Sequence, residues 1–559
     1  MDKGRAQLTW ILLAIVGFLT VAPVVMLALG SVSEGMTAFG KLTTDKYIAA
    51  YTDPALFQVL FNTTIFVLGS SVLATVLAVF LAYLNTRTDI PFKFLFGILS
   101  IIPMMIPHLL FSVSWALLLN PSNGMINMLL KNVLSLENAP FNIYSLEGMI
   151  LVEALLDLPI AYLIIAPAMR SFDVALEESS RVFGAGTWRT LLRVTLPVLR
   201  PAILAAFVLG VVRALSSFAV PQVLGMPGRV NVLATHIYEM ISLGYTPDYG
   251  KAAAVGMSVL ATSVTLIYVY RALTAESGKY VTIAGRGYRP TLIELGKARV
   301  PLFAIVALLS FVMAVLPVAV LLYTSFVPYV MVPDARAFSA MNLKHWIDVL
   351  GDPLSLLAIK NSLFLAVAGA TLGTLLSVFV GYAIVKVKTR ASGLLESLTF
   401  LSFSFPGIVI GVGFMWFFVQ TPLYATIWAL LIGYIATYLP YGARPMASAF
   451  VTIHAHLEES SAVCGASPMT TMRRIIVPLL IPGIVSSWIL MASMFVRELN
   501  LSVVLSRPGT EVLAIQILKF ADDGLWGKLS ALGIIMIAIT TVLVVMATLV
   551  GNRLRALQS

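Results

Sequence analysis

The sequence predicts an all-α membrane protein with about twelve transmembrane helices in two homologous six-helix halves. Three observations predict this fold: long apolar runs recur along the chain, their order repeats once, and basic residues gather in alternate connecting segments. Of the 559 residues, 59% are hydrophobic and only 11% are charged, which excludes an ordinary soluble protein. A helix needs about 20 apolar residues to cross the hydrocarbon core of a bilayer. In that core the backbone must satisfy its own hydrogen bonds, so these runs should be helices.

The first apolar run begins like a secretory signal peptide, with Lys3 and Arg5 before it. It lacks a small-residue cleavage site, so we expect a retained helix. The shorter alternating segments of a transmembrane β-barrel are not what the sequence shows. The runs lie near 9–30, 60–84, 95–119, 148–170, 198–220, 252–273, 301–325, 363–385, 397–419, 425–445, 482–505 and 529–550.

The positive charges follow the connecting segments that face one side of the predicted membrane. With the N-terminus in the cytoplasm, the cytoplasmic segments hold most of the 36 Lys and Arg residues but fewer than half of the 26 Asp and Glu residues. Cytoplasmic segments of membrane proteins carry this excess of Lys and Arg. The distribution of the charges, whose net value is +10, therefore indicates a lipid bilayer rather than nucleic acid as the partner, and it places both termini in the cytoplasm.

The chain repeats itself, first at a separation of 299 residues and then at 281. Without a gap, 12 of 25 residues in 177–201 are identical to those in 458–482. The smaller separation means that the first half carries 18 extra residues between 120 and 148, in a segment expected outside the cell. Matched pairs include Asp53 and Asp352, Asn62 and Asn361, Tyr83 and Tyr382, Pro107 and Pro406, and Arg193 and Arg474.

An even number of spans in each repeat gives both repeats the same orientation, so a pseudo-twofold axis should run along the membrane normal. We expect a first six-span half at 1–273, a cytoplasmic linker at 274–300 and a second six-span half at 301–559. The linker is polar, basic and too short for a typical globular domain.

The repeated block at 177–201 follows the fourth predicted span of its half. An acidic stretch that favours a helix precedes Gly184, a basic stretch follows, and Leu196-Pro197 precedes the next apolar run. Glycine suits a helix end or a close backbone approach. Proline suits the first turn of a helix. The block therefore predicts a short surface helix, a sharp turn and re-entry into the membrane.

These two blocks resemble the EAA loop of permeases in binding-protein-dependent ABC importers, in which Glu-Ala-Ala precedes a Gly and a later Leu-Pro. Serine replaces both alanines in both halves, and Val477 replaces the second leucine. The resemblance implies that each loop docks on a cytoplasmic ATPase. The residues carrying it are Glu178, Ser179, Ser180, Gly184, Ala185 and Pro197 in the first half, and Glu459, Ser460, Ser461, Gly465, Ala466 and Pro478 in the second.

Sequence in three further places resembles fused two-half permeases of the ferric-iron uptake group: Tyr280–Pro290, Ser217–Pro221 with Leu224–Pro227, and Phe495–Leu499 with Pro508–Leu513. The resemblance implies import of ferric iron through the bacterial cytoplasmic (inner) membrane. Permeases for thiamine, polyamines, sulfate and phosphonate share much of this architecture and stay open as alternatives. An ion-driven secondary transporter, which can also have two parallel halves, is a more remote alternative, because it needs no coupling loops.

The chain has no pattern of an ATPase, a soluble substrate-binding domain or a catalytic centre, so we expect it not to be an enzyme. The resemblance implies two copies of a cytoplasmic ABC ATPase, which would hold ATP and Mg, and an extracytoplasmic binding protein. Cys464 is the only cysteine, which excludes an intrachain disulfide and a cysteine metal cluster. We expect no metal site, because the five histidines are scattered.

A few ionisable residues fall inside the predicted spans, where charges are costly. Glu153 and Asp157 are four residues apart, on one face of the fourth span. Arg213 lies in the fifth span at a depth similar to that of Asp157, and Arg497 and Glu498 lie in the eleventh. They line a polar pathway, form structural contacts with Asp157 paired to Arg213, or lie at a lipid interface.

Overall fold

A computed structural model describes residues 2–34, 40–100, 102–242, 247–275, 292–387 and 389–556. The stretch Tyr280–Pro290, and with it most of the predicted linker, lies outside the described residues. Within them the chain is built of helices, with two isolated β-bridges, Ser33 to Leu42 and Thr88 to Ile293. The predicted all-α membrane fold is confirmed.

Nine helices among the described residues are long and apolar enough to cross a membrane, or ten if one bent pair counts as a single span. They coincide with nine of the predicted runs. They are α1 (Asp2–Val32), α3 (Pro54–Arg87), α7 (Leu146–Ser171), α10 (Leu196–Leu215), α12 (Tyr249–Ala275), α13 with α14 (Arg299–Ser310, Leu316–Phe326), α17 with α18 (Pro353–Phe364, Ala370–Tyr382), α24 (Val477–Val496) and α27 (Trp526–Ala556).

The third predicted span of each half is a broken pair rather than one helix. In the first half, α4 (Lys93–Leu99) is followed by α5 (His108–Leu119), and in the second, α19 (Arg390–Leu401) is followed by α20 (Gly407–Phe418). The matched residues Pro107 and Pro406 occupy the N-cap positions of α5 and α20. Proline has no backbone N–H to continue a helix. Because the proline is present in both repeats, both halves have the break.

The remaining predicted span, 425–445, is α21 (Ile427–Val451), whose 25 residues are long enough to cross a bilayer. It is missing from the nine apolar spans because it is less hydrophobic. Three tyrosines, Tyr434, Tyr438 and Tyr441, and Arg444 lie along it. Its helical form agrees with the prediction, and its polarity marks it as a helix that faces protein.

The helices form two compact units that do not follow the two halves of the sequence. One unit contains 1–52, 237–260 and 343–559, and the other contains 53–236 and 261–342. In the first unit, α1 packs on α19 and α20, and in the second, α13 and α14 pack on α4 and α5. The leading helix of each sequence half therefore packs with helices of the other half. The boundaries at 273 and 301 stay a prediction about the sequence repeat, as does the pseudo-twofold axis.

Small residues explain how α1 fits its place. A Cβ at Gly413 of α20 would lie 2.4 Å from the carbonyl oxygen of Pro23, and one at Gly30 would lie 2.5 Å from the ring of Trp416. Helices in membranes use such glycines to bring their backbones close together. The unit thus depends on glycine on both sides of the α1–α20 contact.

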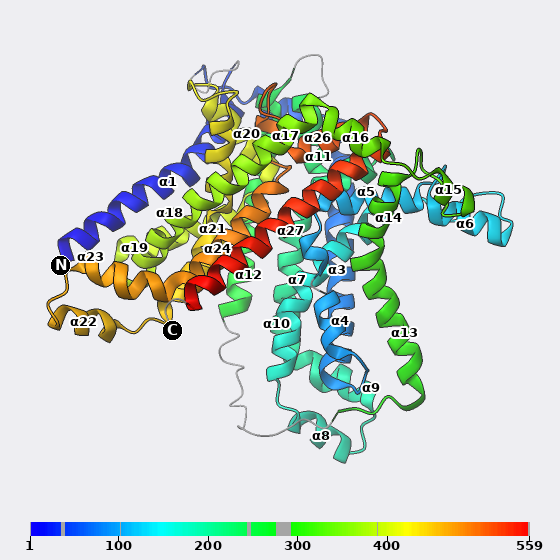
Figure 1. Ribbon diagram of the computed structural model, residues 1–559, viewed down its shortest axis with the longest axis horizontal. Helices are drawn as coiled ribbons and strands as arrows, with labels where there is room; N and C mark the ends of the chain where they lie inside the picture. Colours follow the sequence, from blue (N-terminus) through cyan, green and yellow to red (C-terminus); the bar gives the residue numbers. More distant parts are fainter. Residues whose placement is uncertain are drawn as a thin grey trace. The chain divides into compact units, whose positions relative to one another are not determined.

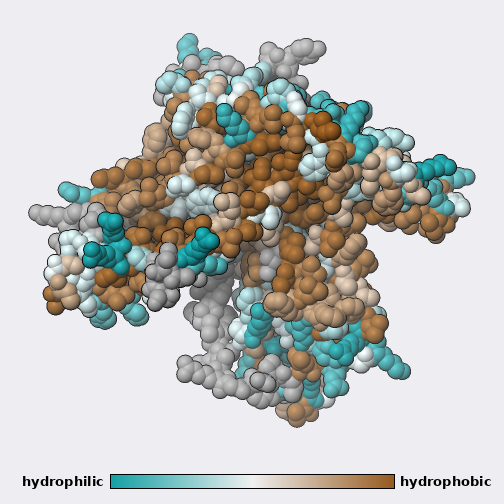
Figure 2. Space-filling model, viewed as in Figure 1, coloured by the Kyte–Doolittle hydropathy of each residue, from teal (hydrophilic) through white to brown (hydrophobic). Residues whose placement is uncertain are grey.

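In the unit built from 53–236 and 261–342, α3, α7 and α10 run side by side, and the short helices α8 (Ala175–Val182) and α9 (Thr187–Thr190) lie at one end of them (Figure 1). In the other unit, α18, α21 and α24 pack together, and α22 (Ala455–Val463) and α23 (Pro468–Thr471) lie at the end where α1 begins and α27 stops (Figure 1). Hydrophobic residues cover the sides of α18, α24 and α27 (Figure 2), as a lipid-facing surface requires.

Candidate functional site: paired coupling loops and membrane polar clusters

Residues 175–197 and 455–478 are called the first and second coupling loops, after the role that the resemblance implies. The first is a short helix closed by a glycine turn. Helix α8 ends at Val182, and Gly184 follows with φ +82°. The N–H of Gly184 donates to the Arg181 carbonyl at 2.8 Å, and the N–H of Ala185 donates to the Ser180 carbonyl at 3.1 Å. These two bonds form a Schellman motif, which favours glycine at the residue with positive φ. The sequence-predicted turn is therefore present.

The second coupling loop has the same turn. Helix α22 ends at Val463, Gly465 has φ +78°, and the N–H groups of Gly465 and Ala466 donate to the carbonyls of Ala462 and Ser461 at 3.0 and 3.1 Å. A Cβ at Gly184 or at Gly465 would meet no atom of this chain within 4 Å. Backbone conformation, not crowding inside the chain, therefore requires glycine at both turns.

The second serine of each loop ties the short helix to the helix that follows. The hydroxyls of Ser180 and Thr190 lie 3.0 Å apart, and those of Ser461 and Thr471 lie 2.7 Å apart. Alanine at this position, as in the family pattern, could not make the bond. Ser179 and Ser460 are exposed, and the Ser179 hydroxyl donates to the carbonyl of Ala175.

Each coupling helix is also held by a basic residue at the end of the second span, a contact that the sequence reasoning missed. Arg87 Nε lies 3.6 Å from Glu177 Oε1, and Lys386 Nζ lies 3.3 Å from Glu458 Oε1. Glu177 and Glu458 precede the predicted Glu178, which is half-buried, and Glu459, which is exposed. Arg87 and Lys386 are 299 residues apart, so the repeat itself carried the signal.

The predicted prolines lie where each short helix runs into a membrane helix. Pro197 and Pro478 are in the first turns of α10 and α24. One π-helical turn, Leu191–Thr195 or Met472–Ile476, comes before each of them. The predicted re-entry is therefore a continuous helix with a π turn. That turn changes the hydrogen-bond register just before the proline, which cannot donate.

The tips of the two loops are exposed and apolar. Val182, Phe183 and Trp188 are 85%, 89% and 70% exposed in the first loop. Val463 is 88% exposed in the second, and Cys464 beside it is exposed. Large apolar side chains at the tip of a polar loop indicate an interaction surface, for a protein or for lipid.

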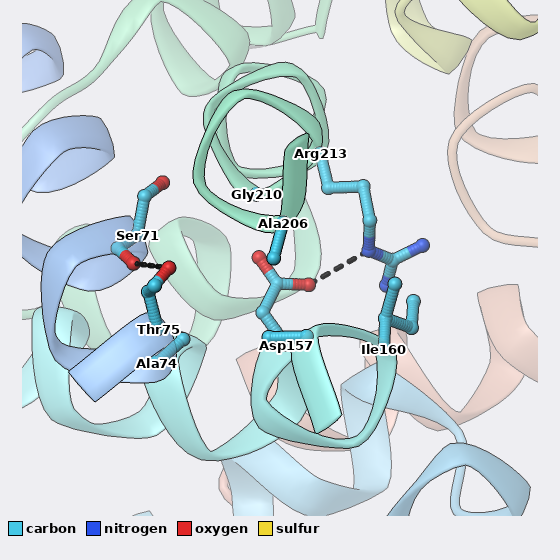
Figure 3. Close-up of a pocket in the computed structure, with 9 residues that line it drawn as sticks. Ser71, Ala74, Thr75, Asp157, Ile160, Ala206, Gly210 and Arg213 are labelled. Carbon is cyan, nitrogen blue, oxygen red and sulfur yellow. Dashed lines mark hydrogen bonds and ion pairs between the residues drawn. The ribbon is translucent and has the colours of Figure 1, made fainter. Parts of the chain in front are cut away.

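The first membrane polar cluster lies between α7 and α10 (Figure 3). Arg213 Nε donates to Asp157 Oδ1 at 2.7 Å. Outside that view, Ser217 Oγ donates to Glu153 Oε2 at 2.7 Å. The Asp157 side chain is 2% exposed and that of Arg213 27%. The small pocket beside the pair, lined also by Ser71, Thr75 and Gly210, has no room for a water molecule. This geometry favours the structural interpretation of the pair, which stays a prediction.

The second membrane polar cluster lies between α21 and α24. Glu498 is buried, and its carboxylate accepts a hydrogen bond from the Tyr438 hydroxyl and one of 2.6 Å from the N–H of Leu501. The Tyr434 hydroxyl pairs with Ser502 at 2.5 Å. Arg497 Nη2 contacts Met494 Sδ at 3.1 Å. The sequence singled out Arg497 and Glu498 but not the tyrosines that hold Glu498.

The sequence pattern of the family described as "Binding-protein-dependent transport system inner membrane component" matches residues 74–276 and 373–556, more than half of the chain. The chain belongs to this family. Both matches contain a coupling loop and a membrane polar cluster, so the duplication seen in the sequence is a duplication of this domain.

Curated relatives include two ferric permeases. The ferric transport system permease protein FbpB of Actinobacillus pleuropneumoniae is 28% identical over 476 residues, which cover 84% of this chain and 67% of the relative. The putative ferric transport system permease protein FbpB 1 of Haemophilus influenzae is 28% identical over 435 residues, covering 77% and 66%. The chain thus spans about two thirds of the length of these relatives.

A polyamine permease is also similar, over a shorter stretch. The spermidine/putrescine transport system permease protein PotC of Haemophilus influenzae is 27% identical over 193 residues, which cover 34% of this chain and 75% of the relative.

Proposed function

We propose that this permease is the membrane subunit of an ATP-driven importer that takes ferric iron from an extracytoplasmic binding protein. The observation that carries the proposal is the pair of coupling loops with the same glycine turn, the same hydroxyl tie and the same ion pair. Family membership supports dependence on a binding protein. The names of the FbpB relatives support ferric iron as the substrate.

The two loops give the chain two docking sites, one for each copy of a cytoplasmic ABC ATPase. On each ATPase the exposed tip, Val182-Phe183 or Val463-Cys464, enters a groove, with Glu178 or Glu459 on the coupling helix beside it. ATP and Mg are held by that partner, so hydrolysis belongs to it and the permease itself performs none. In the unit that contains α22, helix α1 begins and helix α27 ends on the side of the coupling loop (Figure 1), which supports cytoplasmic termini.

Transport follows from alternating access between the two sides of the inner membrane. ATP binding moves the docked ATPases, each coupling helix moves with its ATPase, and the membrane helices follow. Asp157 and Arg213 form an ion pair in a closely packed region between α7 and α10. The pair therefore holds these two helices together during this movement.

The substrate is tested by uptake in cells that lack the chain and in cells that regain it. We expect restored uptake of radiolabelled ferric iron, unchanged uptake of spermidine and thiamine, and copurification of an ATP-binding chain with the tagged permease. Restored spermidine or thiamine uptake with unchanged iron uptake would contradict the substrate.

The energy source is tested in the same cells. We expect iron uptake to stop when ATP is depleted and to survive a protonophore as long as ATP is maintained. Uptake that survives ATP depletion and stops with the protonophore would overturn the proposal in favour of an ion-driven transporter.

A further inference from the structure

The second span of each half is anchored at its loop end to the start of the coupling helix. Arg87, the last residue of α3, lies against Glu177 and donates from Nη2 to the carbonyls of Met169 and Phe172 at 2.9 and 3.2 Å. The side chains of Arg87 and Glu177 are 4% and 3% exposed. Thr195 also donates to Glu177 at 2.7 Å. Arg87 thereby joins three parts of one corner: the end of α3, the end of α7 and the coupling helix.

The second half repeats this anchor with different residues. Lys386 Nζ lies 3.3 Å from Glu458 and donates to the carbonyl of Ile453 at 2.7 Å. Ile453 stands 281 residues after Phe172, and Glu458 stands 281 after Glu177. Arginine has become lysine and phenylalanine has become isoleucine, yet the cation contacts the same carboxylate and the same carbonyl. The contact is common to both halves, while the side chains that make it differ.

The opposite end of the second span carries a second duplicated anchor. In the first half, Asn62 Nδ2 donates to the carbonyl of Asn231 at 3.2 Å, and Thr63 Oγ1 accepts from the N–H of Leu233 at 2.9 Å. Leu233 is the first residue of the short helix α11 (Leu233–Ser242). These bonds fix the segment before α11 to α3.

The counterpart in the second half again uses a changed side chain. Asn361 Nδ2 donates to the carbonyl of Glu511 at 2.9 Å, and Ser362 Oγ accepts from the N–H of Leu513 at 2.8 Å. Leu513 is the first residue of the short helix α26 (Leu513–Asp522). In each half the two anchors lie 25 residues apart, from Asn62 to Arg87 and from Asn361 to Lys386. An α-helix rises 1.5 Å per residue, so this separation is about 37 Å.

We propose that Arg87 and Lys386 are positioning residues that fix the coupling helices to the second spans, so that each span carries the movement of its coupling helix to the short helix anchored at its far end. The inference rests on the proposed function, because it needs an ATPase to move the coupling helix. In this arrangement α11 and α26, on the side predicted to face the binding protein, move in step with the ATPase. Packed side chains and secondary elements carry coupling between sites about 20–40 Å apart.

The anchor at the loop end of each second span is tested with Glu177→Gln combined with Glu458→Gln. Glutamine keeps the shape and still accepts from Thr195, but it removes the charge that faces each cation. The purified complex with its ATPase and binding protein is reconstituted in vesicles, and uptake and ATP hydrolysis are measured per assembled complex. We expect ATPase copurification and basal hydrolysis to be kept, and substrate transported per ATP to fall about tenfold. Uptake per ATP within twofold of the wild type would overturn the proposal.

The chain suggests a conservative control variant, because its two halves use different cations at this anchor. Arg87→Lys combined with Lys386→Arg keeps a cation at each anchor, and we expect uptake per ATP within twofold of the wild type. A purely structural role predicts a different pattern, in which the glutamine variant lowers only the amount of complex. If no ATPase copurified with the wild-type chain, the proposed function itself would be refuted. Failure of the proposed function can therefore be distinguished from failure of this inference.

Adjacent threonines give a matched control for the far anchor. Thr63→Val removes the acceptor for the Leu233 N–H, whereas Thr64→Val removes only a bond to the carbonyl of Leu60 in the same helix. We expect Thr63→Val, combined with Ser362→Ala, to lower uptake per ATP at least threefold, and Thr64→Val to leave it unchanged. Equal uptake per ATP in both variants would overturn the part of the proposal that concerns the far end.

Discussion

The two coupling loops are built alike, whereas the two membrane polar clusters are built differently. In both loops a glycine of positive φ closes a Schellman motif and a pair of hydroxyls ties the short helix to the next. In the membrane, Asp157 and Arg213 form an ion pair in the first half, and a Tyr438 hydroxyl holds Glu498 in the second. Two surfaces proposed to fit the same partner keep the same form, while an internal contact needs only to be satisfied.

The clusters differ by an exchange of positions. At the separation of 281, Glu153 matches Tyr434, Asp157 matches Tyr438, and Ser217 matches Glu498. In the first half the acid is on α7 and the hydroxyl comes from the segment after α10; in the second half the hydroxyl is on α21 and the acid follows α24. Each half thus keeps a carboxylate–hydroxyl contact between its fourth and fifth helices. Met494 stands where the first half has Arg213.

The largest expected effect is loss of the ion pair in the first half. Asp157→Asn leaves the Arg213 charge without its carboxylate, and breaking a buried pair on one side costs about 3–5 kcal/mol. We expect a much smaller yield of monodisperse protein after detergent extraction. Arg213→Met, which copies Met494, should restore most of that yield when it is added to Asp157→Asn. A normal yield for the single variant together with poor uptake would show that the pair lines the pathway instead.

A smaller loss should follow in the second half, where no arginine occupies the position of Arg213. Tyr438→Phe removes one donor to the buried Glu498 carboxylate and leaves the N–H of Leu501. An unsatisfied buried polar group costs about 1–3 kcal/mol. The thermal midpoint of the detergent-solubilised protein should fall, and Glu498→Gln added to Tyr438→Phe should recover part of the loss. An unchanged midpoint for Tyr438→Phe would contradict the role given to this contact.

The glycine turns should respond equally in the two loops. Alanine at φ near +80° costs about 1–2 kcal/mol, because its Cβ approaches the backbone. Gly184→Ala and Gly465→Ala should each weaken ATPase copurification with normal membrane insertion. Asparagine tolerates positive φ, so Gly184→Asn keeps the turn and tests whether a side chain obstructs docking. Copurification equal to the wild type in both alanine variants would contradict the turn as a requirement for docking.

The smallest expected effect concerns the hydroxyl ties. Ser180→Ala and Ser461→Ala each remove one hydrogen bond, worth about 0.5–1.5 kcal/mol, and alanine is what the family pattern has at this position. We expect a slight fall in uptake that is similar for the two variants. A strong loss in one half only would show that the loops are not equivalent, and would break the comparison.

The sequence predicted what the repeat and the hydrophobic pattern encode locally. The apolar runs and the glycine turns depend on neighbouring residues and were predicted, whereas the breaks at Pro107 and Pro406 were not, because 95–119 and 397–419 were each expected to be a single helix. The packing of α1 with α19 and α20 could not be predicted, because hydrophobicity says where a helix lies but not which helix it meets. The partners of Glu177 and Glu498 were missed for the same reason, since Arg87 and Tyr438 are distant in sequence.

The central claim is that two equivalent loops dock on an ATPase, and the chain carries its own probe for it. Cys464 is exposed at the second tip, and Phe183→Cys with Cys464→Ser moves the single thiol to the matched position of the first tip. Thiol labelling is measured in inside-out membrane vesicles with the ATPase bound and after its removal. We predict that the bound ATPase slows labelling at both positions at least tenfold and to a similar extent. Equal labelling rates with and without the ATPase at either position would contradict the claim.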